Sequence, residues 1–147
     1  MLSRNSRRER PLSVDIRDGE EFTRFILNRK HFSAENKRVK ANALLPMTNK
    51  VTGRLETSTH RVAGLNNQEI WSLGYEHVEN VANNRIIKAR GQGPFGLVSA
   101  SGLSCDVNGP PYPRHVDVIG WPTDKDAQLM KAIEIADKMA LEIDPRL

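Results

Sequence analysis

Two Arg–His pairs in strand-like segments supply the side chains best suited to chemistry: His60 with Arg61, and His115 with Arg114. Imidazole is the side chain that most readily takes and gives protons near neutral pH. Because side chains alternate along a strand, His115 and Asp117 share one face, where the carboxylate can orient or charge the imidazole. If the two segments pair, both histidines can face one phosphate while an arginine balances developing negative charge. These five residues are therefore predicted to be the catalytic groups of a metal-independent ribonuclease or another nucleotide- or phosphodiester-processing enzyme.

A metal site is a competing use of the same side chains. His60, His115 and Asp117 would supply two imidazoles and one carboxylate, a set that suits several transition metals. No local motif such as H-x-H, H-E-x-x-H or a Cys/His cluster fixes two ligands at once. The prediction is a site without metal or cofactor, and the metal site remains an alternative.

The other reactive side chains have structural explanations. His77 lies on the apolar stripe of an expected helix, which indicates packing, and His31 ends a basic segment where it can cap carbonyl groups. Cys105 is the only cysteine, so it excludes an internal disulfide, and in an expected strand it is predicted to be a small buried hydrophobe. The glycine-rich segment 90–96 lacks the spacing of a dinucleotide loop and is predicted to be a flexible turn or a loop covering the substrate.

Hydrophobic spacing predicts the elements that must position these residues. A capping residue followed by apolar residues three or four apart predicts helices beginning at Asp18, Asn66 and Thr123. The third is expected to continue to Asp144, with Ile133 on its buried face. Strand-like runs occupy 38–45, 54–62, 86–90, 97–100, 103–107 and 115–121, and residues 49–53 form the turn of a hairpin. This order predicts an α+β fold: one domain over residues 12–147, with a mainly antiparallel sheet and about three helices.

Charge is concentrated at the start of the chain. The 147 residues carry a net charge of +4, but residues 1–40 alone carry +5 and the remainder −1. Residues 1–11 contain too little apolar surface to order themselves and are predicted to be a disordered basic arm. Lysine and arginine of this kind contact phosphates without regard to base sequence. The predicted nucleic-acid-binding residues are Arg4, Arg7, Arg8, Arg10, Arg29, Lys30, Lys37, Arg38 and Lys40.

Aromatic side chains make up only 5% of the chain. Phe95, among glycines, and Tyr112, among prolines, are the two rings expected to be exposed. Each has one arginine nearby, as a stacking platform for single-stranded nucleic acid requires.

The leading functional hypothesis is a small basic protein that binds nucleic acid, RNA included, or another polyanion as a subunit of a larger assembly. A protein partner or a second copy of the chain is therefore expected. The alternatives are the enzyme described above and an accessory or inhibitor subunit that binds protein. The single cysteine and the absence of a long apolar stretch favour a cytoplasmic protein without a membrane partner.

Three short segments carry a resemblance to other proteins. Residues 36–40, 59–62 and 114–122 resemble segments of small prokaryotic proteins to which no activity is assigned. The likeness extends over most of residues 20–143. It implies no fold, ligand or catalytic residue.

Overall fold

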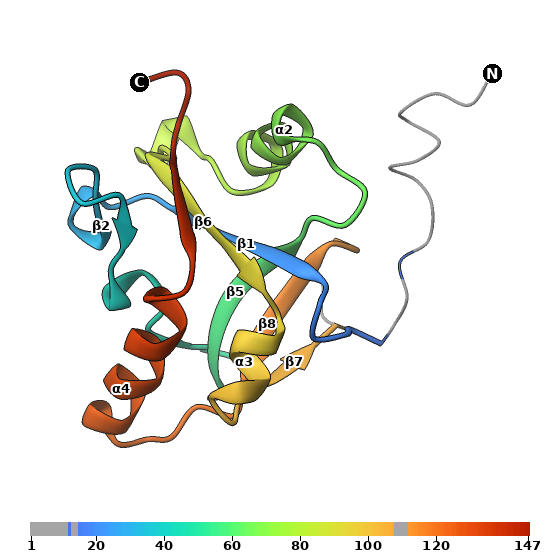
Figure 1. Ribbon diagram of the computed structural model, residues 1–147, viewed down its shortest axis with the longest axis vertical. Helices are drawn as coiled ribbons and strands as arrows, with labels where there is room; N and C mark the ends of the chain where they lie inside the picture. Colours follow the sequence, from blue (N-terminus) through green and yellow to red (C-terminus); the bar gives the residue numbers. More distant parts are fainter. Residues whose placement is uncertain (1–11, 13–14, 108–111) are drawn as a thin grey trace.

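A seven-stranded antiparallel sheet runs through the centre of the computed structural model, which describes residues 12, 15–107 and 112–147 (Figure 1). Its strands follow the order β7-β8-β5-β1-β6-β9, and β4 adds to β5 outside this path. The strands are β1 (Glu21–Ile26), β4 (Met47–Thr48), β5 (Leu55–Arg61), β6 (Ala89–Pro94), β7 (Ser104–Asp106), β8 (His115–Ile119) and β9 (Ala140–Ile143). A separate two-stranded sheet pairs β2 (Phe32–Ser33) with β3 (Arg38–Val39). The α+β fold with a mainly antiparallel sheet is thus confirmed.

Helices cover both faces of the sheet. They are α2 (Asn67–His77), α3 (Gly96–Ala100) and α4 (Lys125–Ala136), with 3₁₀ turns η1 (Arg29–His31), η2 (Ala41–Ala43) and η3 (Val81–Asn83). On one face, α3 and α4 pack over the larger core, which includes Phe22 of β1 and Val116 of β8. On the other, α2 packs over a smaller core that includes Phe25. Alternation along the strands therefore sends His115 and Asp117 to the α2 face, opposite the side chains of Val116 and Val118.

Several elements match the sequence predictions. α2 begins with a capping box in which Asn66 and Glu69 each accept a hydrogen bond from the other's backbone N–H. The predicted turn after Asn49 is present, although the strand that it joins to β5 is β4 and not the expected run 38–45. β7 and β8 lie inside the predicted runs at 103–107 and 115–121. Within the residues that the structure describes, no helix is long and apolar enough to cross a bilayer.

The prediction of a helix beginning at Asp18 is wrong, because Glu21–Ile26 forms strand β1. Phe22, Phe25 and Ile26 have helical spacing, but here they serve a strand buried on both sides. Phe22 and Ile26 enter the larger core, and Phe25 enters the smaller one. Short runs of this kind fit either period, and pairing with β5 and β6 decides between them.

The third predicted helix is too long. α4 ends at Ala136, and Ala140–Ile143 leaves it to pair with β6 as strand β9. The predicted buried face is also wrong, since Ile133 is 42% exposed whereas Ile135 is 1% exposed. The helix presents a narrower face of small and branched residues to the core than its spacing predicts.

The predicted breaks and strands between residues 38 and 100 also change. The glycine-rich segment is not a loop, because β6 runs through Gly91 and Gly93 between β1 and β9. A Cβ at Gly91 would lie 2.8 Å from both Met139 Cε and Val39 Cγ2, so glycine lets these side chains pack directly on the backbone. Residues 97–100 belong to α3 rather than to a strand, and the expected strand 38–45 is divided between β3 and η2. Phe95 is buried in the larger core.

Candidate active site

A pocket opens where β1 and β5 diverge. These strands pair only at Phe22 with Arg61 and at Thr23 with His60, although both strands continue beyond. The next residue of β1, Arg24, fills the gap with its guanidinium. Arg24 Nε donates to the Ala43 carbonyl at 2.8 Å, and Arg24 Nη1 donates to the Ser58 carbonyl at 2.9 Å. The cavity beyond has a volume of about 580 Å³, within the range of sites for small molecules.

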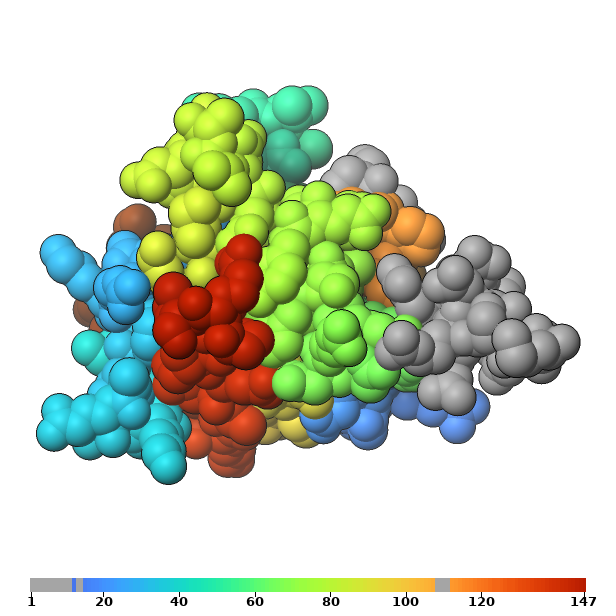
Figure 2. All heavy atoms as spheres, turned by 90° about the horizontal axis from the view of Figure 1, so that it is seen from above, coloured from blue at the N-terminus to red at the C-terminus, as the bar shows by residue number. Residues whose placement is uncertain are grey.

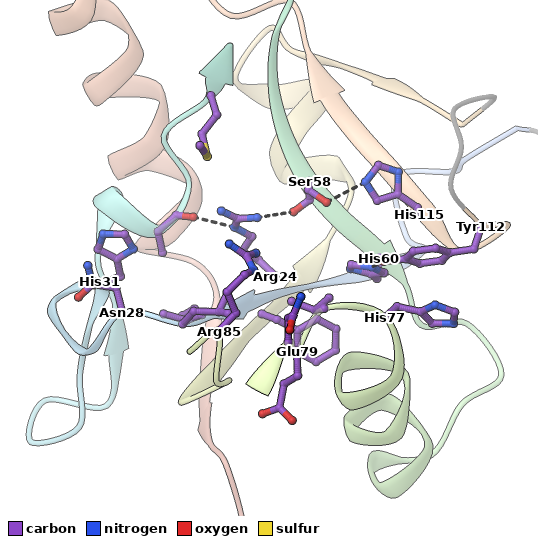
Figure 3. A pocket seen from close by; sticks show the side chains of 17 residues that line it. Arg24, Asn28, His31, Ser58, His60, His77, Glu79, Arg85, Tyr112 and His115 are labelled. Atoms are coloured by element: carbon purple, nitrogen blue, oxygen red, sulfur yellow. Dashed lines mark hydrogen bonds between the residues drawn. The ribbon is translucent and has the colours of Figure 1, made fainter. Parts of the chain in front are cut away.

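All four histidines of the sequence line this pocket (Figure 3). His60 and His115 come from adjacent sheet strands, His77 from the last turn of α2, and His31 from η1. From the sequence, His77 is expected to pack in the core and His31 to cap carbonyl groups. Instead, His77 is exposed at the rim and stacks on Tyr112 with 4.0 Å between ring centroids, and half-buried His31 contributes to the wall.

The predicted histidine pair is formed. His60 and His115 are direct partners across the β5–β8 ladder, with ring centroids 5.7 Å apart and the rings nearly perpendicular. Both are more than 90% buried. Burial lowers the pKa of His60 to about 3, and the charges of His115, Arg24 and His77 add to the effect. His60 is therefore a neutral imidazole at physiological pH.

Tyr112 lies against both imidazoles. Its ring stacks on His60 at 5.3 Å and meets His115 edge-on at 5.6 Å, and its hydroxyl forms a short hydrogen bond with His60 Nε2. Burial raises the pKa of Tyr112 to about 12, so the phenol keeps its proton and donates a hydrogen bond to Nε2. The remaining proton of neutral His60 then belongs on Nδ1.

His115 contacts a hydroxyl and a carboxylate through one nitrogen. Its Nε2 lies 2.7 Å from Ser58 Oγ and 3.4 Å from Asp117 Oδ1. A serine nucleophile needs the carboxylate on the opposite imidazole nitrogen, Nδ1, to hold the tautomer that accepts the serine proton. That arrangement is absent from these three residues, which argues against a serine hydrolase. Asp117, whose pKa is raised mainly by burial, instead provides an ion-pair partner for an imidazolium at His115.

The other nitrogen of each imidazole has no partner within the part of the chain that the structure describes. Nδ1 of His60 and Nδ1 of His115 are enclosed and have no hydrogen-bond partner among the described residues. A buried unsatisfied polar atom costs about 1–3 kcal/mol, and such atoms are few in native structures. The third one among the described residues, Arg90 Nε, does not belong to this pocket. By contrast, Nε2 of His60 contacts Tyr112 and Nε2 of His115 contacts Ser58, and both partners line the pocket. In each imidazole, Nδ1 is thus enclosed and Nε2 is hydrogen-bonded to a group that lines the pocket.

Two arginines make the pocket cationic. Among the described residues, neither Arg24 nor Arg85 has a carboxylate partner. Burial and, to a smaller extent, repulsion from Arg85 lower the pKa of Arg24 to about 10, so the guanidinium stays charged at neutral pH. Burial and the charge of Arg24 also lower the pKa of His31. A partly enclosed cation without a counter-ion favours an anionic ligand.

The two arginines that the sequence pairs with these histidines lie elsewhere. The Arg61 side chain points to the opposite face of β5, where it binds both carboxylate oxygens of Glu20 at 2.6 and 2.7 Å. Arg114 donates to the backbone carbonyls of Arg61 and Ala63 and does not line the pocket. The sequence does not single out Arg24, because the spacing of its segment predicts a helix. A charged residue within an apolar run of a buried strand would have been the signal for it.

The predicted nucleic-acid-binding residues divide into two groups. Arg4, Arg7, Arg8 and Arg10 lie outside the described residues, together with the expected arm. Arg29, Lys30, Lys37, Arg38 and Lys40 are all exposed, and Arg38 forms an ion pair with Asp137 at 3.7 Å. Asn28 and His31 line the pocket, and Arg29 and Lys30 lie between them in the chain. A basic surface therefore adjoins one end of the cavity.

Neither a metal site nor a similar protein points to a ligand for the pocket. In the part of the chain that the structure describes, no three His, Cys, Asp or Glu side chains converge as a group that could hold a metal ion. Comparisons with protein-family models, with curated proteins and with solved structures found no match. The function must therefore be argued from the pocket itself.

Proposed function

We propose that the protein is a metal-independent ribonuclease that uses His60 and His115 as its acid–base pair. The observation that carries the proposal is that a cross-strand histidine pair shares one pocket with an arginine that has no carboxylate partner among the described residues. Ring centroids 5.7 Å apart bring both imidazoles within reach of one phosphodiester, as shared proton transfer requires.

RNA is the substrate that this chemistry selects. One imidazole removes the proton from the ribose 2′-hydroxyl, and the 2′-oxygen attacks phosphorus. The bond from phosphorus to the 5′-oxygen breaks, and the second imidazole gives a proton to that oxygen. The products are a 2′,3′-cyclic phosphate and a 5′-hydroxyl, with one proton taken and one returned. The nucleophile belongs to the substrate, so neither a metal-bound water nor a protein nucleophile is required.

The surroundings support a division of roles between the two histidines. His60 is neutral at physiological pH because of its lowered pKa, and so it can accept the 2′-hydroxyl proton. His115 has Asp117 beside the same nitrogen, and this carboxylate can hold the imidazolium that serves as the acid. Arg24 and Arg85 are placed to stabilise the extra negative charge on the phosphoryl oxygens in the transition state. The Ser58 hydroxyl is hydrogen-bonded to Nε2 of His115, and the Tyr112 hydroxyl to Nε2 of His60. Substrate oxygens would take the places of these two hydroxyls.

The test is cleavage of a short RNA by purified protein in the presence of a chelator. The wild type should yield cyclic-phosphate ends, and RNA with a 2′-deoxy residue at the cleaved position should be resistant. His60→Gln and His115→Gln should each lower kcat by about 10²–10⁴-fold. Arg17→Gln, which changes an exposed arginine outside the pocket, is the matched control and should retain the wild-type rate.

Two results would reject the proposal. Wild-type protein that cleaves no RNA, across varied sequences and structures, would remove the activity. Histidine variants that cleave as fast as the wild type would place any activity elsewhere. Activity lost on chelation would instead favour the metal alternative at the same residues.

Binding of nucleic acid without turnover is the second candidate, supported by the exposed basic residues beside the pocket. Deleting residues 1–10 removes four arginines and should lower the slope of log affinity against log salt by up to about 4. An unchanged slope would show that this segment makes no phosphate contacts.

A further inference from the structure

Among the described residues that line the pocket, Glu79 is the one carboxylate. It follows α2 and directly precedes the turn in which Asn80 and Arg85 form a backbone bridge. Glu79 therefore lies in the same wall as Arg85, within a pocket whose other polar side chains carry cations or hydrogen-bond donors. A free carboxylate here would pair with a guanidinium and repel a phosphate.

Both oxygens of Glu79 are instead occupied from outside the pocket. Arg146 Nη1 donates to Oε1 at 3.1 Å, and Nη2 forms a short hydrogen bond to Oε2. The backbone N–H of Ile87 also donates to Oε2, at 3.0 Å. Figure 3 shows the carboxylate directed away from the guanidinium groups of Arg24 and Arg85. These bonds, with that from Arg146 the strongest, lower the pKa of Glu79 despite its burial.

Arg146 is itself fixed in place near the C-terminus. Its guanidinium stacks on the Tyr75 ring at 3.8 Å and donates to Asp144 Oδ2 at 2.9 Å. Asp144 is fully buried and also accepts a hydrogen bond from the Tyr75 hydroxyl at 3.0 Å. The C-terminal segment (red) consequently lies against α2 (green) and the segment that contains η3 (yellow-green) in Figure 2.

We infer that Arg146 is a positioning residue that keeps Glu79 away from the phosphate, so that the pocket selects a ligand rich in anionic oxygens. The inference rests on the proposed function, because it assumes that Arg24 and Arg85 bind phosphate. Without Arg146, the Glu79 carboxylate loses its counter-ion and turns toward the nearest cations, which line the pocket. The ligand then meets a neutralised arginine pair and an added negative charge.

Phosphate binding to charge variants tests this role. Arg146→Gln should weaken the binding of inorganic phosphate by about tenfold or more, as a like charge entering a partly enclosed anion site requires. That tenfold loss corresponds to about 1.4 kcal/mol. Adding Glu79→Gln to the variant should restore binding to within about twofold of the wild type, because it removes the carboxylate charge. Asp137→Asn breaks the exposed ion pair with Arg38 outside the pocket and is the matched control. Thermal melting of each variant identifies any that do not fold, and Arg146→Lys provides a milder variant that keeps a cation beside Glu79.

The outcomes separate the two proposals. Weak binding that Glu79→Gln does not rescue would mean that Arg146 supports only the fold, and unchanged binding in Arg146→Gln would show no role at all. Either result overturns the inference and leaves the proposed function intact. Wild-type protein that binds no phosphate would overturn both. If Arg146→Gln does not fold, Arg146→Lys with near wild-type affinity and a single Glu79→Gln change of less than about twofold support the inference. A tenfold gain from Glu79→Gln alone refutes it.

Discussion

His60 should make the protein less stable as the pH falls. The imidazole has a pKa of about 6.5 in the unfolded chain and about 3 in the native structure, because burial and nearby positive charges oppose its protonation. Below pH 6.5 the unfolded state therefore binds a proton that the native state does not. This contribution to stability is therefore complete above pH 6.5 and is lost as the pH falls toward 3.

The magnitude follows from the same values. Each pH unit within this window changes the free energy of unfolding by up to about 1.4 kcal/mol, which gives an upper limit of about 5 kcal/mol over the whole window. Between pH 7.5 and 4.5 the loss attributable to His60 is about 3 kcal/mol. A typical domain is stable by roughly 5–15 kcal/mol, so this loss in the free energy of unfolding is large enough to measure.

The assay is chemical denaturation at several pH values for the wild type and for His60→Gln. Glutamine does not titrate, and its amide can still hydrogen bond to Tyr112. Other titrating groups, including Asp117, are common to both proteins and cancel in the difference. The wild type should lose about 3 kcal/mol more than the variant between pH 7.5 and 4.5. Identical pH profiles, or an NMR titration of His60 with a midpoint near 6.5, would refute the reasoning that this imidazole is held neutral.

Three further results are expected. Sulfate, whose charge is constant over this range, should bind more tightly as the pH falls from 6 to 4 and should raise the pKa of His60, because a bound anion offsets the repulsion from Arg24; pH-independent binding would argue against a shared site. Ile135→Ala should cost about 2–5 kcal/mol in denaturation experiments and Ile133→Ala under about 1 kcal/mol, since only Ile135 is buried; the reverse order would contradict the packing of α4. Gly74→Ala should cost about 1–3 kcal/mol because its Cβ would lie 2.5 Å from Phe25 Cε1, whereas Gly19→Ala, with nothing within 4 Å, should be nearly neutral; equal melting temperatures would show that α2 can move away.

The sequence by itself determined the features that depend on local interactions. Asn66 and Glu69 cap α2 through backbone groups three residues apart, so their spacing was sufficient to predict the helix start. Strand alternation likewise placed His115 and Asp117 on one face, where they now lie 3.4 Å apart. Those two predictions required no knowledge of the rest of the chain.

Only the tertiary structure decided the identity of ambiguous segments and the composition of the pocket. The run from Phe22 to Ile26 fits a helix or a strand until β5 and β6 flank it, and Gly91 belongs in a strand because β1 and β9 pair with it on either side. The contact between His60 and His115 depends on the register of strands more than 50 residues apart. Arg24 and Arg85 replace Arg61 and Arg114 in the pocket because the side-chain faces and the divergence of β1 from β5 are set by long-range pairing. Such pairing is a property of the whole chain, since each strand's partner satisfies its backbone hydrogen bonds and buries its faces, and no local spacing records it.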